Sequence, residues 1–326
     1  MKRPVWKEPS GKGCLIVLKI VVLGSSAGGG SPQWNCNCPV CRQVRAGAPG
    51  TRPRTQSSIT VSADGENWFL FNASPDLGHQ ILSNSALHPA KGERHSPIVG
   101  AVVTNGDVDH VTGLLTVRES HPLAVYGTSR VQSVLADNSI FNVLNPEYVE
   151  RRILKMGQPT ELKTKDGKSA GIIIEPFTVP GKIALWLEDE SAGENFGSQP
   201  EDTIGLKISA KDGDEHFFYI PGCASFPPEL AERLTDAPLV FFDGTLWQDD
   251  EMKTSHVGVK TGNRMGHMSN SGPEGTVAAF APLNVKRKVF IHINNTNPIL
   301  IDNTPERAEV EAADWEVSYD GMEITL

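Results

Sequence analysis

Residues 101–115 read AVVTNGDVDHVTGLL, and this stretch carries the strongest indication of both fold and chemistry. A β-branched apolar run ends at the turn formers 104–106, and Asp107, Asp109 and His110 follow within four positions, ahead of a short helical pattern. A buried strand that ends in carboxylates and an imidazole, with a helix behind them, suits metal ligands. Because aspartates in turns also serve as helix N-caps, the rest of the chain has to decide between the two interpretations.

The composition is that of an ordinary globular protein with a large core. The chain has 326 residues, of which 39% are hydrophobic and 21% charged, and a formal net charge of −9. This acidic balance argues against nucleic acid and anionic membranes as partners. No apolar run is long enough to span a membrane.

The N-terminus contains an apolar run, Cys14–Leu23, that follows basic residues and is similar to a secretory signal. Lys19 interrupts this run, so we expect residues 20–23 to form the first strand instead. We therefore predict an N-terminal extension at residues 1–18 and a single domain at residues 19–326.

The apolar pattern beyond this point is mostly that of strands, broken by glycine and proline turns. The glycine-rich segment 24–30 lacks the spacing of a nucleotide-binding loop. The acidic segment Glu188–Asp202 is expected to be a mobile loop that can act as a lid. Expected strands are 19–23, 57–63, 66–71, 123–126, 172–177, 204–208, 217–220, 239–242 and 289–293, and expected helices include 129–135 and 227–234.

Three cysteines, Cys36, Cys38 and Cys41, form a C-x-C-x-x-C motif. Of five cysteines in the chain, three crowd into six positions, which is not a disulfide framework and indicates the reducing cytoplasm. Three thiolates on a tight loop suit a structural Zn²⁺ ion, with a fourth ligand from a distant segment. The alternative is a redox pair of Cys38 and Cys41, but we expect no thioredoxin-like helix after the motif.

Two further buried strands end in candidate ligands, Asp243 and His292, and His267 lies in a loop just before a helix. Each is a weak indication alone, since a single histidine at a strand end is often structural. Together with Asp109 and His110 they predict one site, because ligands at the same ends of adjacent strands gather at one edge of a sheet.

The order of TNGDVDH, FDGT, GHM and IHINN after an N-terminal strand resembles the metallo-β-lactamase fold. More narrowly, GSSAGGG, PQWNCNCP, RPRTQSS, FNASPD, IHINNTNPIL and YDGMEI, spread over residues 24–324, resemble the PqqB family of pyrroloquinoline quinone (PQQ) biosynthesis. The resemblance implies an α/β (α+β) fold, the αβ/βα four-layer sandwich, in which two mixed β-sheets carry helices on their outer faces.

The resemblance also implies which metal site remains. The first loop of the wider fold reads H-x-H-x-D-H and holds two metals, whereas Asn105 and Asp107 replace both of its first two histidines here. The remaining ligands imply one Fe²⁺ ion with open positions rather than two-zinc hydrolysis, and Asp107 becomes a weak ligand or a residue that orients His110 or His267. The candidate catalytic residues are Asp107, Asp109, His110, Asp243, His267 and His292.

A related branch, the phosphodiesterase PhnP, closes its cysteine site with a histidine three residues after the active-site histidine. Asn295 stands at the matching position here. Asparagine is a poor zinc ligand, so the chemistry of Asn295 gives only weak support to it as the fourth ligand.

The resemblance implies an iron-dependent hydroxylase that uses O₂ on a tyrosine-derived intermediate of the PqqA peptide. The sequence does not determine which metal a purified sample carries, and Zn²⁺ can replace Fe²⁺ there because divalent-metal affinities favour zinc over iron. Arg52, Arg54 and Arg264 are candidate anchors for substrate carboxylates, although Arg52 and Arg54 equally fit a solvated loop. Expected partners are other PQQ biosynthesis proteins and a second copy of the chain. A Zn²⁺-dependent hydrolase and a carrier that assists transport of PQQ or its precursor to the periplasm stay open as alternatives.

Overall fold

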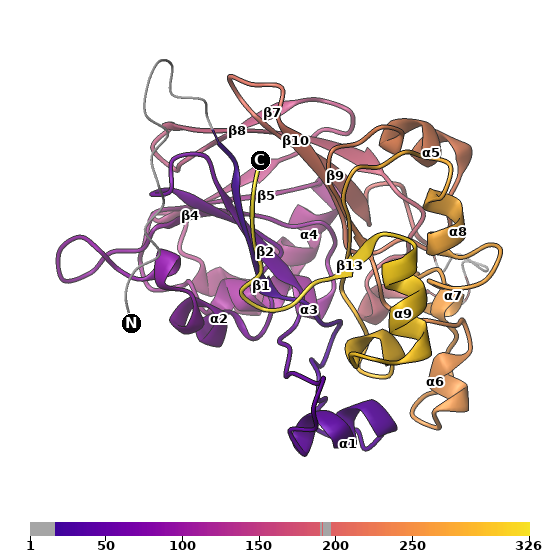
Figure 1. The fold of residues 1–326 in the computed structure, drawn as a ribbon. Helices are drawn as coiled ribbons and strands as arrows, with labels where there is room; N and C mark the ends of the chain where they lie inside the picture. Colours follow the sequence, from indigo (N-terminus) through magenta and orange to yellow (C-terminus); the bar gives the residue numbers. More distant parts are fainter. Residues whose placement is uncertain (1–16, 190, 192–196) are drawn as a thin grey trace, which may run out of the picture.

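The computed structural model describes residues 17–189, 191 and 197–326. Two seven-stranded mixed β-sheets pack face to face and carry helices on both outer sides (Figure 1). The first sheet has the order β14-β1-β2-β3-β4-β5-β6, and the second has the order β13-β12-β11-β10-β9-β8-β7. The predicted four-layer sandwich is confirmed.

The strands of the first sheet are β1 Lys19–Gly24, β2 Ser58–Ser62, β3 Trp68–Phe71, β4 Ile98–Val102, β5 Leu123–Gly127, β6 Val149–Ile153 and β14 Glu323–Thr325. Those of the second are β7 Thr160–Lys163, β8 Ser169–Thr178, β9 Ile204–Ala210, β10 His216–Ile220, β11 Val240–Asp243, β12 Lys288–Ile291 and β13 Trp315–Val317. The helices are α1 Pro39–Arg45, α2 Leu77–Ser83, α3 Val108–Val111, α4 Ser129–Asp137, α5 Pro228–Leu234, α6 Glu251–Thr254, α7 Gly262–Met265, α8 Thr276–Phe280 and α9 Pro305–Ala312.

Strand periodicity produces the layers. In β1, Ile20 and Val22 belong to the apolar cluster between the sheets, whereas Val21 and Leu23 face the outer helices. Successive side chains of a strand point to opposite faces, so a strand that is apolar at every position is buried on both sides. The first sheet therefore has to be covered on both faces.

Each sheet has its own set of helices. Leu77 of α2 and Leu135 of α4 pack in the cluster on the outer face of the first sheet. Leu230 of α5, Phe280 of α8 and Val310 of α9 pack in the cluster on the outer face of the second, and these helices lie together on the right of Figure 1. Within the described residues, no helix has the length and apolarity that a membrane span requires.

The first strand, β1, and the last strand, β14, pair in the first sheet. Leu18, assigned above to the N-terminal extension, is buried and exchanges two 3.0 Å backbone hydrogen bonds with Leu326. The domain packing thus includes the last residue of the expected extension, and residues 1–16 lie outside the described part.

All the predicted strands are present, with small shifts at their ends. The sequence analysis missed β6 and β7, because VERRI and TELK carry charges that suit the outermost strands of each sheet. It also missed α9, although Thr304 and Pro305 are standard residues for a helix N-terminus, and Thr304 caps the helix here.

The helix after the central strand begins earlier than predicted. It consists of α3 and a 3-10 helix at Thr112–Leu115, so Asp109 and His110 lie in its first turn rather than in the preceding loop. Asp107 occupies the N-cap position, but its side chain makes no capping hydrogen bond. The ordinary capping interpretation of this carboxylate is therefore wrong.

The strands that carry the candidate ligands belong to different sheets, which corrects the expectation of one sheet edge. Asp109 and His110 follow β4 of the first sheet, whereas Asp243 and His292 end β11 and follow β12 of the second. The ligands meet because the two sheets pack with these strand ends at a common side.

We expect Gly113→Ala to lower the free energy of unfolding by about 3 kcal/mol, because its Cβ would lie 2.2 Å from the Ser74 carbonyl oxygen. This backbone contact holds the ligand-bearing helix against residues 73–74, where Gly113 N–H donates to Ala73 O. Urea unfolding measures the change. Gly213→Ala is the control, since its nearest contact is at 3.7 Å, and equal losses in the two variants would contradict the argument.

Candidate metal centre

Five side chains come together where β4, β11 and β12 end. Asp109, His110 and His292 form one group whose ligand atoms lie within 4.8 Å of one another, and Asp243, His267 and His292 form a second. The His110 and His292 rings are 5.3 Å apart between centroids, and the His267 and His292 rings are 5.1 Å apart. We call these five residues the histidine cluster.

His110 has one ring nitrogen paired and one unpaired. Its Nδ1 lies 2.7 Å from Asn105 Oδ1, which also accepts the backbone N–H of Asp107. Since that atom of Asn105 accepts, Nδ1 carries the proton and Nε2 carries the lone pair. Among the described residues Nε2 is buried without a hydrogen-bond partner. A buried imidazole lone pair beside a carboxylate fits a metal ion.

Burial lowers the pKa of His110 to about 4 and keeps its ring neutral, as ligation requires. Burial also acts to raise the pKa of Asp109, but its interactions with the His110 and His292 rings, including a hydrogen bond from His292, outweigh it and lower that pKa. Asp109 Oδ2 lies 3.1 Å from His292 Nε2. Burial acts to lower the pKa of His292, but the hydrogen bond and charge of Asp109 outweigh it and raise that pKa.

Thr245 joins the other members of the cluster. Its hydroxyl donates to Asp243 Oδ1 at 2.6 Å and lies 2.9 Å from His292 Nδ1 and 3.1 Å from His267 Nδ1. Asp243 is fully buried and also accepts the backbone N–H of Cys223 and a hydrogen bond from His267 at 2.7 Å. The sequence analysis missed Thr245, although FDGT contains it, and named Asn105 only as a replaced histidine, without its bond to His110.

Asp107 lies outside both groups of ligands and orients neither histidine. Its Oδ1 accepts the backbone N–H of Leu185 at 3.1 Å, so it holds the segment 182–188 against the ligand loop. Burial and the nearby charge of Asp109 raise the pKa of Asp107. The expected orienting role belongs to Asn105 for His110, and to Asp243 and Thr245 for His267.

The segment 182–188, which we call the strap, is closed at its base by an ion pair. Lys182 Nζ lies 2.6 Å from Glu188 Oε1, and Arg264 binds both carboxylate oxygens of Glu188. The strap then presents Leu185, 54% exposed, and Trp186, 41% exposed. Part of the expected lid at 188–202, namely residues 190 and 192–196, lies outside the described residues.

Each of the three candidate arginines has a partner outside the histidine cluster. Arg264 pairs with Glu188, and Arg52 lies over the Tyr319 ring near Asp302. Arg54 is buried and donates to the carbonyls of Ser318 and Arg52, and burial lowers its pKa to about 10. Arg54 thus serves the packing of the chain, and Arg264 is the one whose partner belongs to the strap.

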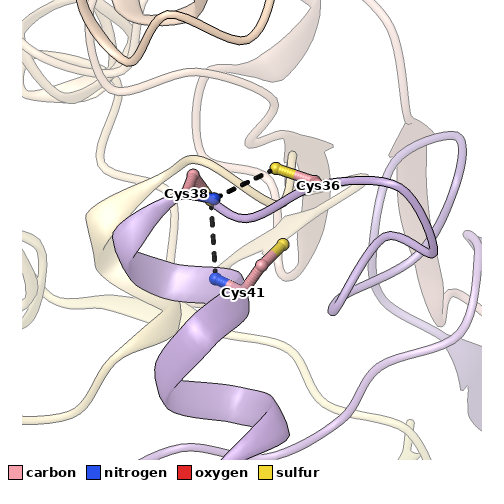
Figure 2. Close-up of side chains that lie close together, drawn as sticks. All are labelled: Cys36, Cys38 and Cys41. Atoms are coloured by element: carbon pink, nitrogen blue, oxygen red, sulfur yellow. Dashed lines mark hydrogen bonds between the residues drawn. The ribbon is translucent and has the colours of Figure 1, made fainter.

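The three cysteines of the C-x-C-x-x-C motif are buried and free, and their Sγ atoms lie within 4.8 Å of one another. Figure 2 shows Cys41 in the first turn of α1, with Cys38 at the start of that turn and Cys36 on the loop before it. The backbone N–H groups of Cys38 and Cys41 point to the sulfurs of Cys36 and Cys38 at 3.4 Å. These three residues form the cysteine cluster.

Asn295 completes the surroundings of the cysteine cluster. Its Nδ2 lies 3.2 Å from Cys41 Sγ, and its Oδ1 is buried and lacks a hydrogen-bond partner in the described ranges. Because amide oxygen and nitrogen are interchangeable by rotation about the last torsion, Oδ1 can face the sulfurs. The three thiols fit a tetrahedral Zn²⁺ site, and the unpaired amide oxygen of Asn295 offers a weak fourth ligand.

The redox alternative has to be reconsidered because α1 begins within the motif. The expectation that no helix follows it was wrong: Cys38 is the N-cap residue of α1, and its side chain accepts from Cys41 N–H. Burial raises the pKa of Cys38 to about 12, which opposes a reactive thiolate. A third thiol and Asn295 in contact still favour a metal over a redox pair.

Glu251 of α6 is a buried carboxyl group that supports the strand-to-loop segment after β12. Its Oε2 accepts the backbone N–H of Trp247 at 2.6 Å, and its Oε1 accepts from the Thr296 hydroxyl. Burial raises the pKa of Glu251 from 4.5 to about 7. Nothing in the local sequence distinguishes this glutamate from exposed ones, so it was not predicted.

The comparisons with known proteins show the family and the fold of the chain. Residues 67–293 match the family model of the beta-lactamase superfamily domain. The chain is similar to "Coenzyme PQQ synthesis protein B" of Xanthomonas oryzae pv. oryzae, with 52% identity over 309 residues, which is 95% of this chain and 100% of the relative. The protein of that name from Gluconacetobacter diazotrophicus is 52% identical over 312 residues, again 95% and 100% of the two chains.

Solved structures are similar over the same length. Zn(2+)-bound PqqB from Methylobacterium extorquens has a TM-score of 0.89 and 46% identity, covering 94% of this chain and 100% of that one. A diphosphatase of the PhnP family has a TM-score of 0.65 and 19% identity, covering 95% and 97%. The second likeness is one of fold alone.

We expect the stability of the metal-free protein to fall as the pH rises through the range in which Glu251 ionises. The raised pKa means that the folded state keeps a proton that the unfolded state releases above pH 4.5, so stability is greatest below that pH and is lost as the pH passes 7. Relative to Glu251→Gln, the loss is about 3 kcal/mol between pH 4.5 and 8. Urea unfolding of both proteins in EDTA measures this difference, and parallel pH profiles would contradict it.

We expect Asn105→Ala to weaken metal binding at the histidine cluster by about 10- to 100-fold, because His110 would lose the bond that fixes its tautomer and ring orientation. Competition with a chromophoric chelator measures the affinity. Asn67→Ala is the control, since Asn67 bonds to Asp64 in an exposed turn. An unchanged affinity in Asn105→Ala would show that His110 does not need this partner.

Proposed function

This chain belongs to the coenzyme PQQ synthesis protein B family, within the beta-lactamase superfamily, and on that premise we propose that it is a one-metal oxygenase of PQQ biosynthesis. In this proposal Asp109, His110 and His292 hold one Fe²⁺ ion. The substrate is a tyrosine-derived intermediate, and the product gains one oxygen atom on its ring. Other proteins of PQQ biosynthesis supply the substrate and take up the product in the cytoplasm.

The unpaired Nε2 of His110 is the observation that carries the proposal. It makes His110 a ligand beside Asp109 and His292, and two imidazoles with one carboxylate are the ligand type of non-haem Fe²⁺ oxygenases. Asn105 holds His110 from the position where the wider fold has a histidine ligand. Because the amide oxygen of Asn105 is bonded to His110, it would not serve as a ligand of a second metal ion at that position.

The bound ion would supply the O₂ chemistry, and the side chains of this chain would supply the environment. His267 Nδ1 bonds to Asp243, so its Nε2 is left to accept the proton of the substrate hydroxyl. Asp243 stabilises the imidazolium that results, as a buried carboxylate next to a general base does.

The exposed apolar residues around Asp107 would suit an aromatic substrate. Val108 is 58% exposed and directly follows Asp107, which holds Leu185 and the strap beside it. Trp186 of the strap offers a ring on which a phenol can stack. Arg264, bound to Glu188, can reach a substrate carboxylate only in competition with that ion pair.

The hydrolase alternative would need two metal ions, and Asp107 is turned to the strap rather than to the ligand groups. The carrier alternative, with transport of PQQ towards the periplasm, would need a metal site that is structural and catalyses no reaction. Both remain as outcomes of the test.

We expect anaerobic loading with Fe²⁺, followed by O₂ and a tyrosine-containing dipeptide, to give a product that is one oxygen atom heavier. Ascorbate supplies the two electrons and the protons come from water, so that the other atom of O₂ leaves as water. Loading with Zn²⁺ gives no such product, and His110→Ala loses at least about 100-fold in rate. Mass spectrometry with ¹⁸O₂ makes the measurement.

His79→Ala is the control variant, because His79 is an exposed residue of α2 whose ring contacts Ser83. Cleavage of the substrate with Zn²⁺ and without oxygen gain would establish the hydrolase instead. Tight binding of PQQ with no turnover under either metal would establish the carrier.

A further inference from the structure

One short piece of backbone joins the two candidate metal sites. The segment Asn294–Asn297, which we call the bridge, begins two residues after His292 of the histidine cluster. Asn295 of the bridge lies 3.2 Å from Cys41 of the cysteine cluster. All four bridge residues are buried, between 0% and 8% exposed. His292 of the histidine cluster and Asn295, which contacts the cysteine cluster, are thus three residues apart along the chain.

The bridge has little freedom to move independently of the histidine cluster. Asn294 N–H donates to Thr245 O at 3.0 Å, and Asn297 Nδ2 donates to Gly244 O at 2.9 Å. Gly244 and Thr245 directly follow Asp243, so the bridge is bound to the segment that carries Asp243 and Thr245 of the site. Within the bridge, Asn294 Nδ2 donates to Thr296 Oγ1 at 2.6 Å, and Thr296 donates to Glu251.

His292 itself depends on its neighbours for its conformation. Its φ is +59°, in the left-handed region that residues other than glycine adopt only where the surroundings enforce it. Thr245 Oγ1 lies 2.9 Å from His292 O and from His292 Nδ1, and Ile293 N–H donates to Ser25 O at 3.0 Å. Because Asn294 N–H donates to Thr245 O, a displacement of the bridge would act on the residue that contacts the ring of His292.

We propose that an ion in the cysteine cluster positions His292 through the bridge and so sets the affinity of the histidine cluster for its own metal. Asn295 is the positioning residue. Its buried Oδ1, unpaired in the part of the chain that the structure describes, gains a partner when the cysteine cluster is filled. The coupling works in both directions, since two linked binding equilibria change each other by the same factor.

The inference rests on the metal sites of the proposed function and not on its reaction. Its test is therefore a binding measurement. Co²⁺ in the histidine cluster has only nitrogen and oxygen ligands and gives weak visible bands, whereas Co²⁺ in the cysteine cluster adds an intense sulfur charge-transfer band, so each occupancy is read separately.

The experiment compares Asn295→Ala and Asn295→Asp in protein first loaded with one equivalent of Zn²⁺. We expect Asn295→Ala to lose Zn²⁺ from the cysteine cluster and to bind Co²⁺ at the histidine cluster at least about 10-fold more weakly. Asn295→Asp keeps an oxygen ligand, holds Zn²⁺ and restores the Co²⁺ affinity. Arg42→Ala is the matched control, because Arg42 lies in α1 next to Cys41 and its guanidinium donates to Asn37 O rather than to the bridge.

Two results would overturn the inference. One is an Asn295→Ala protein that has lost its cysteine-cluster Zn²⁺ yet binds Co²⁺ as the unaltered protein does. The other is an Asn295→Asp protein that holds Zn²⁺ but binds Co²⁺ as weakly as Asn295→Ala, which would make Asn295 a packing residue only. If the unaltered protein binds no Co²⁺ at the histidine cluster, the proposed function fails and not the coupling alone.

A second measurement covers the case in which the Asn295 variants do not fold. In a Cys14→Ser, Cys223→Ser background, an organomercurial releases Zn²⁺ from the cysteine cluster, and dithiothreitol with added Zn²⁺ reverses the change. We expect the Co²⁺ affinity of the histidine cluster to fall by the same factor and to return on reversal. An affinity that stays constant through this cycle would refute the proposal.

Discussion

The carboxylate of Asp243, fully removed from solvent at the end of β11, is the interaction on which the site depends. A buried charge is tolerated only where hydrogen bonds and opposite charges replace its water, and loss of one partner costs about 3–5 kcal/mol. Here the replacements are the N–H groups of Cys223 and Thr245, the Thr245 hydroxyl and His267. The loops that carry Cys223 and His267, together with the loop that follows β11, are thereby tied to the end of that strand.

The same hydroxyl then transmits this order to β12. Thr245 follows β11, the neighbour of β12 in the same sheet, and contacts His292 at both Nδ1 and the carbonyl oxygen, so it fixes the ring that faces Asp109 of the other sheet. The histidine cluster thus spans the seam between the two sheets, and its first group of candidate ligands comes from chain segments 109–110 and 292. The packing of the sheets is part of the coordination geometry.

Asn105 explains how a shared fold can support different chemistry. In the position of a metal-binding histidine it uses its oxygen to orient His110, so it supports one ligand rather than adding another. The strap is held by two sets of contacts: Asp107 accepts the N–H of Leu185, and the Lys182–Glu188–Arg264 ion pairs hold its base. Asn105 and Asp107 thus act in this region through hydrogen bonds.

The sequence by itself determined the buried strands and the family and predicted the candidate ligands, because continuous apolar runs and short motifs such as DVDH, FDGT and C-x-C-x-x-C are local features. It could not show β6 and β7, whose charges conceal them, nor Glu251, which is buried only by contact with Trp247 and Thr296. Only the tertiary structure decided that Asn105 rather than Asp107 orients His110, that Arg54 turns into the core, and that Asn295 links the two clusters. These contacts join residues as far apart as Cys41 and Asn295, and their geometry depends on how the two sheets pack, which no local pattern encodes.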